Sequence, residues 1–469
     1  MAIEQDFKSF KQNIMKYSKD NSKNSLVLSY EDAYEKIIND EEFKKKISSE
    51  IDDRLNDRKN AKAVVKNKEY FRELKKNYNF IITEIVIKNN IVVRGYADRT
   101  KLISDFVEDM VGFSAIKDLM YDDNVTDIYI LKYNKIYYES RKHSKPVKFK
   151  GKFKNEKAFK DFAERLLREA NKGVLDNGEN KVIDFDLYGD RYNAISPAVS
   201  PNGITLTIRK HNEDHITLKQ IIDGGCMTQE VADFLGKLIL GETNMIVAGI
   251  TGSGKTTTMR ALLDYYVTMS NKRMLVCEDT RELFPTNDHT LELVTSIGDN
   301  EKSSIGLRDV IILALRQKPR YIIVGEIRGP EAESAVEAAS TGHSTIFTMH
   351  AGKPINAIDR LVTKYLMQMP NLGIDVVERI IGSSVDYIVI QDDIPGVGRR
   401  ITSITEVEYD YDTRRVSLKP IVKFNIRKNK FEFVNYISLD KAENMLRKGV
   451  KDTELKQYVK EWQKEELED

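Results

Sequence analysis

The residues with the clearest chemical potential run from Gly249 to Thr256 and read Gly-Ile-Thr-Gly-Ser-Gly-Lys-Thr. They fit the phosphate-binding pattern G-x-x-x-x-G-K-[ST] without a mismatch. The glycines let backbone N–H groups approach a polyphosphate, the lysine adds a charge at the outer phosphates, and the last hydroxyl can hold Mg²⁺. The candidate nucleotide-binding residues are Gly249, Thr251, Gly252, Ser253, Gly254, Lys255, Thr256 and Thr257, with Thr256 also the candidate metal ligand.

The flanking elements fit this interpretation. Residues 244–248 form a short apolar run that predicts a strand, and residues 257–269 have the pattern of a helix. Such a helix directs its positive N-terminal dipole at the phosphates. The alternative is a glycine-rich turn that matches by chance, and the strand–loop–helix setting disfavours it.

Two acidic residues follow other apolar runs. Glu326 ends the run 321–325, where Gly325 stands in the place that a metal-binding Asp often takes. We therefore expect Mg²⁺ to rest on Thr256, phosphate oxygens and water, with Glu326 orienting the attacking water or the metal's hydration shell. Glu278 ends the run 273–277 and is a candidate general base, since ligands bind at strand carboxyl ends. The alternative for each acid is a solvated or capping side chain.

Two histidines, His343 and His350, bracket the predicted strand 344–349. An extended strand of this length separates them by about 20 Å, which does not favour a shared metal site. His343 is instead a candidate sensor that donates to the terminal phosphate. A purely structural capping role is the alternative for both.

Composition limits the class of protein. The chain has 469 residues, of which 41% are hydrophobic and 31% charged, and this balance is typical of a folded protein with several domains. The net charge of +1 gives no sign of a nucleic-acid-binding surface. Cys226 and Cys277 are the only cysteines and indicate no disulfide framework. We expect no secretory signal and no membrane-spanning helix, because no apolar run approaches roughly 18 residues.

The chain changes character several times. A polar stretch, residues 1–28, precedes helical apolar spacing through residue 110, although residues 81–93 are β-branched enough to form a strand instead. Short strands and one helix follow, and then strands alternate with helices, which predicts a mostly parallel sheet covered on both faces. The expected divisions are a helical N-terminal extension (1–110), an α+β domain (111–210), a linker (211–225), an α/β domain (226–395), and C-terminal strands with a charged, solvated helical tail (396–469).

These pieces together resemble the secretion ATPase superfamily of type II and type IV secretion. Its four signature boxes appear in order, and the resemblance covers about residues 100–410. The boxes are the phosphate loop 249–256, the acidic box 277–283 (Cys-Glu-Asp-Thr-Arg-Glu-Leu), the segment 315–329 that contains Glu326, and the histidine box 340–351. Segments 189–197 and 203–210 resemble the branch of tight-adherence pilus and conjugation ATPases. The histidine box is shorter than usual in that branch, with the spacing of pilus motors and type II secretion ATPases.

The resemblance implies an α/β fold with a RecA-like P-loop ATPase domain that binds ATP and Mg²⁺. It also implies a homo-hexamer at the cytoplasmic face of the membrane, working with a polytopic inner-membrane platform or secretion-channel protein and with no specific nucleic acid. Arg191 and Arg209 resemble the arginines that reach the nucleotide from another subunit or across a domain cleft. The implied catalytic residues are Glu326, Glu278, Arg209, Arg191 and His343.

Two other classes stay open at this stage. One is a nucleic-acid translocase or helicase on a RecA-like core, which the balanced charge disfavours. The other is a nucleotide-gated scaffold with little turnover, which the intact Lys255, Thr256 and Glu326 disfavour. Stimulation of hydrolysis by single-stranded DNA would identify the first, and a steady-state phosphate-release assay separates the second.

Overall fold

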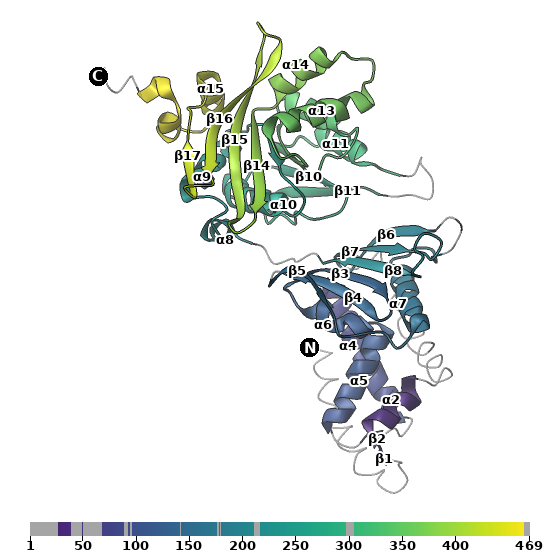
Figure 1. Cartoon of the computed structure of the whole chain (residues 1–469). Helices are drawn as coiled ribbons and strands as arrows, with labels where there is room; N and C mark the ends of the chain where they lie inside the picture. Colours follow the sequence, from purple (N-terminus) through teal and green to yellow (C-terminus); the bar gives the residue numbers. More distant parts are fainter. Residues whose placement is uncertain are drawn as a thin grey trace. The chain divides into compact units, whose positions relative to one another are not determined.

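The chain folds into two compact units, Met1–Asn212 and Glu213–Asp469, and each is described by itself (Figure 1). The computed structural model describes residues 27–38, 49, 68–88, 92–93, 96–140, 142–175, 178, 180–210, 216–296 and 304–463. Within this part of the chain, no helix is both long enough and apolar enough to cross a membrane.

The N-terminal unit begins with helices that share a small apolar core. The elements are β1 (Val27–Leu28), α2 (Tyr30–Ile38), α4 (Lys68–Lys88), β2 (Val92–Val93) and α5 (Tyr96–Met110). Ile82 of α4 and Phe106 of α5 are almost fully buried in this core. The helical expectation is confirmed for these residues, and the strand alternative for 81–93 is wrong up to Lys88, because α4 continues through it. The predicted polar stretch lies outside the described residues except for its last two.

A six-stranded antiparallel sheet forms the rest of this unit. Its elements are η1 (Ser114–Ile116), α6 (Lys117–Tyr121), β3 (Val125–Lys132), β4 (Lys135–Ser140), β5 (His143–Lys148), α7 (Glu156–Glu169), β6 (Val182–Leu187), β7 (Asp190–Ile195) and β8 (Thr205–Arg209). The strand order is β5-β4-β3-β8-β7-β6. Strand β5 was not anticipated, because its polar sequence lacks an apolar alternation.

One face of this sheet carries the core. Along β6 exposed and buried residues alternate, as expected for a strand with one covered face. Phe159, Phe162 and Leu166 of α7 are buried in the same core as the inward residues of β6, β7 and β8. The N-cap of α7 is Asn155, whose side chain accepts a hydrogen bond from the Ala158 N–H at 2.8 Å. The other face of the sheet is left to polar side chains.

The C-terminal unit is built on a nine-stranded sheet in the order β11-β10-β12-β13-β9-β14-β15-β16-β17. The strands from β11 to β14 are parallel. They are β9 (Met245–Ala248), β10 (Met274–Glu278), β11 (Thr290–Val294), β12 (Tyr321–Val324), β13 (Ser344–Met349) and β14 (Tyr387–Ile394). With the phosphate loop directly after β9, this order is the RecA-like arrangement, so the predicted fold class is confirmed. Strand β11 was not anticipated.

Helices cover both faces of the parallel strands (Figure 1). Val247 of β9 lies in one core with α8 (Leu218–Asp223), α9 (Gln229–Leu240) and α10 (Lys255–Ser270). Its neighbour Ile246 lies in the second core, with α11 (Leu307–Leu315), α12 (Ala332–Ser340), α13 (Pro354–Gln368) and α14 (Ile374–Ser384). Because both of their faces are buried, β9 and β12 are continuous apolar runs, which is why they could be predicted.

The chain ends in an antiparallel extension and short helices. These are β15 (Gly398–Asp410), β16 (Arg415–Asn425), β17 (Lys430–Phe433), α15 (Leu439–Arg447), α16 (Asp452–Leu455) and η3 (Lys456–Tyr458). The expected solvated helix face lies on α15, where Asp440, Glu443 and Arg447 are exposed, while Met445, Leu455 and Val459 are buried in the core that contains α9 and the sheet. The described tail is therefore packed on one side and solvated on the other, and burial of one such apolar side chain contributes about 1.5–3 kcal/mol.

Candidate nucleotide-binding and catalytic site

The phosphate loop is packed tightly at the carboxyl end of β9. Gly252 and Gly254 have φ angles of +78° and +89°, a left-handed conformation that strains other residues. A Cβ atom on Gly249 would lie 1.9 Å from the carbonyl oxygen of Gln391 on β14. The Gln391 amide in turn donates to the Ser253 carbonyl at 2.6 Å. The loop is therefore held by contacts with its neighbouring strand.

Lys255, the first residue of α10, is buried and places its ammonium group in this loop. Its Nζ donates to the carbonyl oxygens of Gly249 at 3.1 Å and Ile250 at 2.9 Å. Burial lowers the pKa of Lys255, and the carboxylate of Glu326 acts in the opposite direction. The ammonium group thus lies within the field of an acid that comes from a different strand.

Mg²⁺ would have few protein ligands here. The described residues contain no cluster of three or more His, Cys, Asp or Glu that could hold a metal. Thr256 is half-buried at the start of α10, next to Lys255. A single hydroxyl beside a phosphate-binding loop fits a metal ion that keeps several waters and binds mainly to phosphate oxygens.

Glu326 and His350 meet at the same edge of the sheet. Oε1 of Glu326 lies 2.9 Å from Nε2 of His350, and Oε2 lies 2.5 Å from the Arg328 guanidinium. Nδ1 of His350 lies 3.3 Å from the carbonyl oxygen of Gly249. His350 therefore connects the candidate catalytic acid to the first glycine of the phosphate loop.

Glu278, at the end of β10, lies in a drier environment. Its side chain is buried and accepts from the backbone N–H groups of Glu282 and Leu283 at 3.2 and 3.1 Å. Burial raises its pKa to about 8, so the carboxyl group keeps its proton at neutral pH. A Cβ on Gly325 would lie 2.9 Å from Cγ of Glu278, which explains the glycine at this strand end. The raised pKa disfavours Glu278 as a catalytic base, whereas Glu326 lies beside His350 and within the electrostatic influence of Lys255.

Within the C-terminal unit, His343, the predicted sensor, lies at the other end of β13 from the phosphate loop. His343 precedes β13, whereas the phosphate loop follows β9, and these two strands are parallel with Met349 opposite Ala248. The strand length places His343 about 20 Å from the loop. Burial lowers the pKa of His343, and its Nδ1 lies 3.2 Å from the Thr341 hydroxyl. His350 is the histidine at the site, and its position one residue beyond the carboxyl end of an apolar run was the available signal.

Arg191 and Arg209 lie on the polar face of the N-terminal sheet. They are opposite each other on β7 and β8, and Asp127 of β3 is opposite Arg209. Directly opposed residues of antiparallel strands project to the same face. The Arg209 Nε lies 3.3 Å from the Asp127 carboxylate, with more than half of the arginine side chain exposed. The two predicted arginines are thus brought together within their own unit.

The predicted linker 211–225 contains folded residues. Leu218 and Ile221 of α8 are buried in the core of the C-terminal unit. Gly225 follows α8 with φ +73°, and a Cβ there would lie 3.1 Å from the Arg400 guanidinium, which also donates to the Gly224 carbonyl at 3.4 Å. These contacts hold the two glycines in place at the end of a packed helix.

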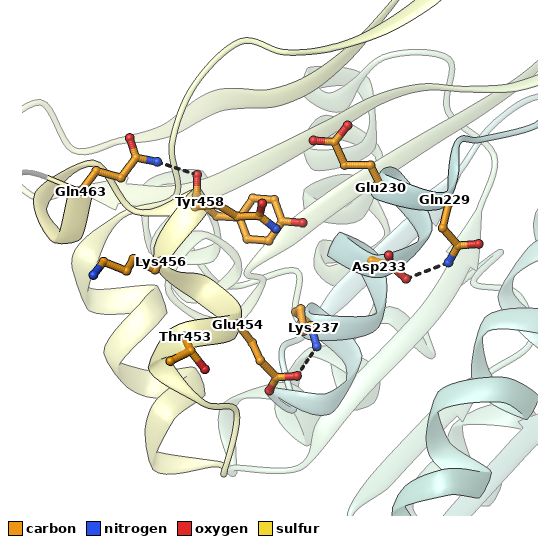
Figure 2. Close-up of a pocket in the computed structure, with 10 residues that line it drawn as sticks. Gln229, Glu230, Asp233, Lys237, Thr453, Glu454, Lys456, Tyr458 and Gln463 are labelled. Atoms are coloured by element: carbon orange, nitrogen blue, oxygen red, sulfur yellow. Dashed lines mark hydrogen bonds and ion pairs between the residues drawn. The ribbon is translucent and has the colours of Figure 1, made fainter. Parts of the chain in front are cut away.

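An open groove of about 1020 Å³ lies elsewhere, between α9 and the C-terminal helices (Figure 2). Its polar side chains pair with one another: Lys237 with Glu454 at 2.5 Å, and Gln229 with Asp233 at 2.8 Å. No residue that lines it belongs to the phosphate loop or to the acidic strand ends. The groove is a polar surface between α9 and the packed C-terminal segment, and it is separate from the candidate site.

Comparison with known proteins places this site in a family. Residues 188–400 match the family described as type II/IV secretion system protein. An uncharacterized protein of Methanocaldococcus jannaschii is 31% identical over 320 residues, which are 67% of this chain and 55% of that protein. The chain therefore spans only about half the length of that relative. The conjugal transfer protein TrbB of Rhizobium radiobacter is 28% identical over 48% of this chain and 67% of its own length.

A solved structure shows a more distant likeness. The crystal structure of the VirB11 ATPase from the Brucella suis type IV secretion system is 22% identical, with a TM-score of 0.33 over 62% of this chain and 91% of that one. The matched family region contains the phosphate loop, Glu278, Glu326, His350 and both arginines. The chain belongs to the type II/IV secretion system protein family, the superfamily that its sequence motifs indicated.

Proposed function

We propose that this member of the type II/IV secretion family is a Mg²⁺-dependent ATPase. It works as a hexameric ring that powers assembly of a type IV-like pilus or of a secretion or conjugation system. One observation carries the proposal: Lys255, Glu326 and His350 come together at one edge of a parallel sheet, from three different strand ends. Ligands bind at such edges, and the residues are those that phosphoryl transfer requires.

Each residue has a distinct task in this proposal. The N–H groups of the loop and the Lys255 ammonium hold the phosphates of ATP. Thr256 holds Mg²⁺, which would neutralise phosphate charge when bound. Glu326 orients the attacking water, and His350 fixes the carboxylate relative to Gly249, as the contacts of 2.9 and 3.3 Å allow. Glu278 is a buried, neutral carboxyl group that packs beneath the site.

Arg209 and Arg191 complete the proposed site from the N-terminal unit. A planar guanidinium stabilises the charge on the transferring phosphoryl group, and its delivery by movement of the unit would couple closure to hydrolysis. In a ring, the arginines reach the nucleotide across the subunit interface or within one subunit. We further propose a location at the cytoplasmic face of the membrane, with a polytopic platform or channel protein as the partner and no specific nucleic acid.

The activity is tested by phosphate release from ATP and Mg²⁺ with the purified full chain. Glu326→Gln should keep nucleotide binding and reduce turnover by roughly 10²–10⁴-fold, because the amide cannot accept a proton. Glu337→Gln on the exposed face of α12 is the matched control and should leave turnover unchanged. Wild-type turnover in Glu326→Gln would remove Glu326 from the mechanism, and no hydrolysis by the wild-type chain would remove the proposed function.

The ring is tested separately, by light scattering with Mg²⁺ and a non-hydrolysable ATP analogue. We expect a mass near six times the chain mass of 53.9 kDa. A strict monomer at micromolar concentration under these conditions would contradict the hexamer without contradicting the ATPase activity.

A further inference from the structure

A third arginine, Arg399, lies beside the phosphate loop within the C-terminal unit itself. It lies near the start of β15, opposite Asp393 in the hairpin that joins β14 to β15. A Cβ atom built on Gly254 would lie 3.2 Å from Cδ of Arg399 and 3.6 Å from its Nε. The same position lies 3.1 Å from the Gln391 amide, which holds the loop. The arginine side chain therefore passes close to Gly254, the residue that caps the N-terminus of α10.

The environment of Arg399 differs from that of its neighbour Arg400. Arg400 donates to the carbonyl oxygens of Gly224 and Arg399 and lies 5.8 Å from the centre of the Phe424 ring. Arg399 is exposed, and its guanidinium makes no hydrogen bond or ion pair with any residue in the described part of the chain. Arg400 therefore stabilises the fold, whereas the five N–H donors of Arg399 are available at the entrance of the phosphate-binding loop.

The strand order decides which part of a nucleotide Arg399 can reach. Strand β9 lies between β13 and β14. Glu326 and His350 follow β12 and β13, so the transferred phosphate and its attacking water belong on that side. Arg399 approaches from the opposite side, that of β14 and β15, near the first turn of α10. This side is left for the part of the nucleotide that is not transferred.

We propose that Arg399 binds the α- and β-phosphates of the nucleotide, as a phosphate-binding residue that belongs to the same subunit as the loop. This inference rests on the proposed ATPase function and deepens it. A guanidinium fork suits two phosphate oxygens at once. Because ADP and ATP share these phosphates, Arg399 contributes equally to the binding of both and little to the chemical step. It therefore differs from Arg209, which is assigned to the transferring phosphate.

The test is equilibrium binding of ADP and of a non-hydrolysable ATP analogue to the full chain, measured by titration calorimetry. Arg399→Ala should weaken both ligands by the same factor, about 10- to 100-fold, which is the range for a lost charge-assisted hydrogen bond. Arg399→Lys should recover part of the affinity, since it keeps the charge and loses the fork. In hydrolysis, KM should rise while kcat changes little.

The matched control is Arg414→Ala. Arg414 is also an exposed arginine, in the turn between β15 and β16, beyond the opposite end of β15. Its removal changes the net charge by the same amount and should leave both affinities unchanged. Thermal unfolding of each variant checks that the fold is retained.

The outcomes separate the inference from the proposed function. A wild-type chain that binds neither nucleotide would overturn the proposed function. Wild-type binding with equal affinities in Arg399→Ala and Arg414→Ala would overturn only the role of Arg399. A loss confined to the ATP analogue would overturn the assignment to the α- and β-phosphates, because it would place Arg399 at the terminal phosphate.

Discussion

The two sheets of this protein present their functional residues in different ways. In the parallel sheet of the C-terminal unit, both faces are buried under helices, and Lys255, Glu326 and His350 lie beyond the strand ends. In the antiparallel sheet of the N-terminal unit, one face is open within that unit, and Arg191 and Arg209 lie on it, near the start of β7 and at the end of β8. Each sheet keeps polar groups where water or a ligand can reach them.

The two groups of residues also differ in how firmly their contacts hold them in place. Residues at the edge of the parallel sheet are fixed by contacts from several strands, such as the one from His350 to Gly249. Among the described residues, Arg209 forms one ion pair, with Asp127, and more than half of the arginine side chain is exposed. Exposed pairs contribute about 0–1 kcal/mol, so this arginine can leave its partner at little cost. The edge is suited to a fixed site, and the open face to a group that moves.

The largest effect is expected from removing Arg209 on the open face of the N-terminal sheet. Arg209→Ala should bind nucleotide nearly normally yet lose hydrolysis by roughly 10³–10⁵-fold, because charge on the transferring phosphoryl group is no longer stabilised. Arg168→Ala, an exposed arginine on α7 at the covered side of the sheet, is the control and should hydrolyse ATP normally. Phosphate release and nucleotide binding are measured on both.

Mixed assemblies sharpen this prediction. Subunits with Lys255→Ala still supply an intact Arg209, so mixing them with Arg209→Ala subunits should restore part of the activity if the arginine acts across an interface. Absence of rescue would place its action within one subunit. Normal hydrolysis by Arg209→Ala alone would show that the open face carries no catalytic group.

The next largest effect is expected at His350, in comparison with His343 at the other end of β13. His350→Ala should reduce turnover by about 10- to 100-fold, the usual cost of losing a group that orients a catalytic residue. His343→Ala, at the other end of β13, should leave turnover unchanged, and any effect should be confined to the free energy of unfolding. His350→Gln should recover part of the rate. The opposite ranking of the two alanine variants would restore the sensor role to His343.

A smaller effect is expected at the close approach of two strand ends. Gly325→Ala places a Cβ 2.9 Å from Cγ of Glu278, so one of the two strand ends must shift. We expect a loss of about 1–3 kcal/mol in the free energy of unfolding, together with reduced turnover. Gly352→Ala has no atom within 4 Å of the added Cβ and is the control for chemical denaturation of both variants. Equal stabilities would show that the edge is less tightly packed than these distances indicate.

The smallest effect is a pH dependence of stability. The pKa of Glu278 is raised from 4.5 to about 8, so the folded chain binds more protons than the unfolded chain between these values. Its contribution to stability is therefore complete below pH 4.5 and is lost as the pH rises toward 8. Glu278→Gln should remove this loss, on the order of 1–3 kcal/mol between pH 6 and pH 9. Denaturant titrations at both pH values measure it, and parallel curves for wild type and variant would contradict a raised pKa.

Much of the C-terminal unit could be predicted because its signals are local. The strands β9 and β12 are uninterrupted apolar runs, and the phosphate loop follows β9 at a fixed spacing. Strand β5 was missed because its sequence is polar, and β11 because its five residues, Thr-Leu-Glu-Leu-Val, form a short alternation and no continuous apolar run. The charged residues of the C-terminal tail predict a solvated helix face but not the burial of Leu455 and Val459 on the other side.

The sequence by itself determined the phosphate loop, the acids that follow two strands, and the family, since each depends on residues that are neighbours in the chain. Only the tertiary structure decided that His350 and not His343 lies at the loop, because parallel pairing of β9 and β13 brings their carboxyl ends together. It also decided that Glu278 is buried, which raises its pKa, and that Arg399 reaches Gly254. These properties depend on burial and on contacts between distant segments, which no local pattern of residue types records.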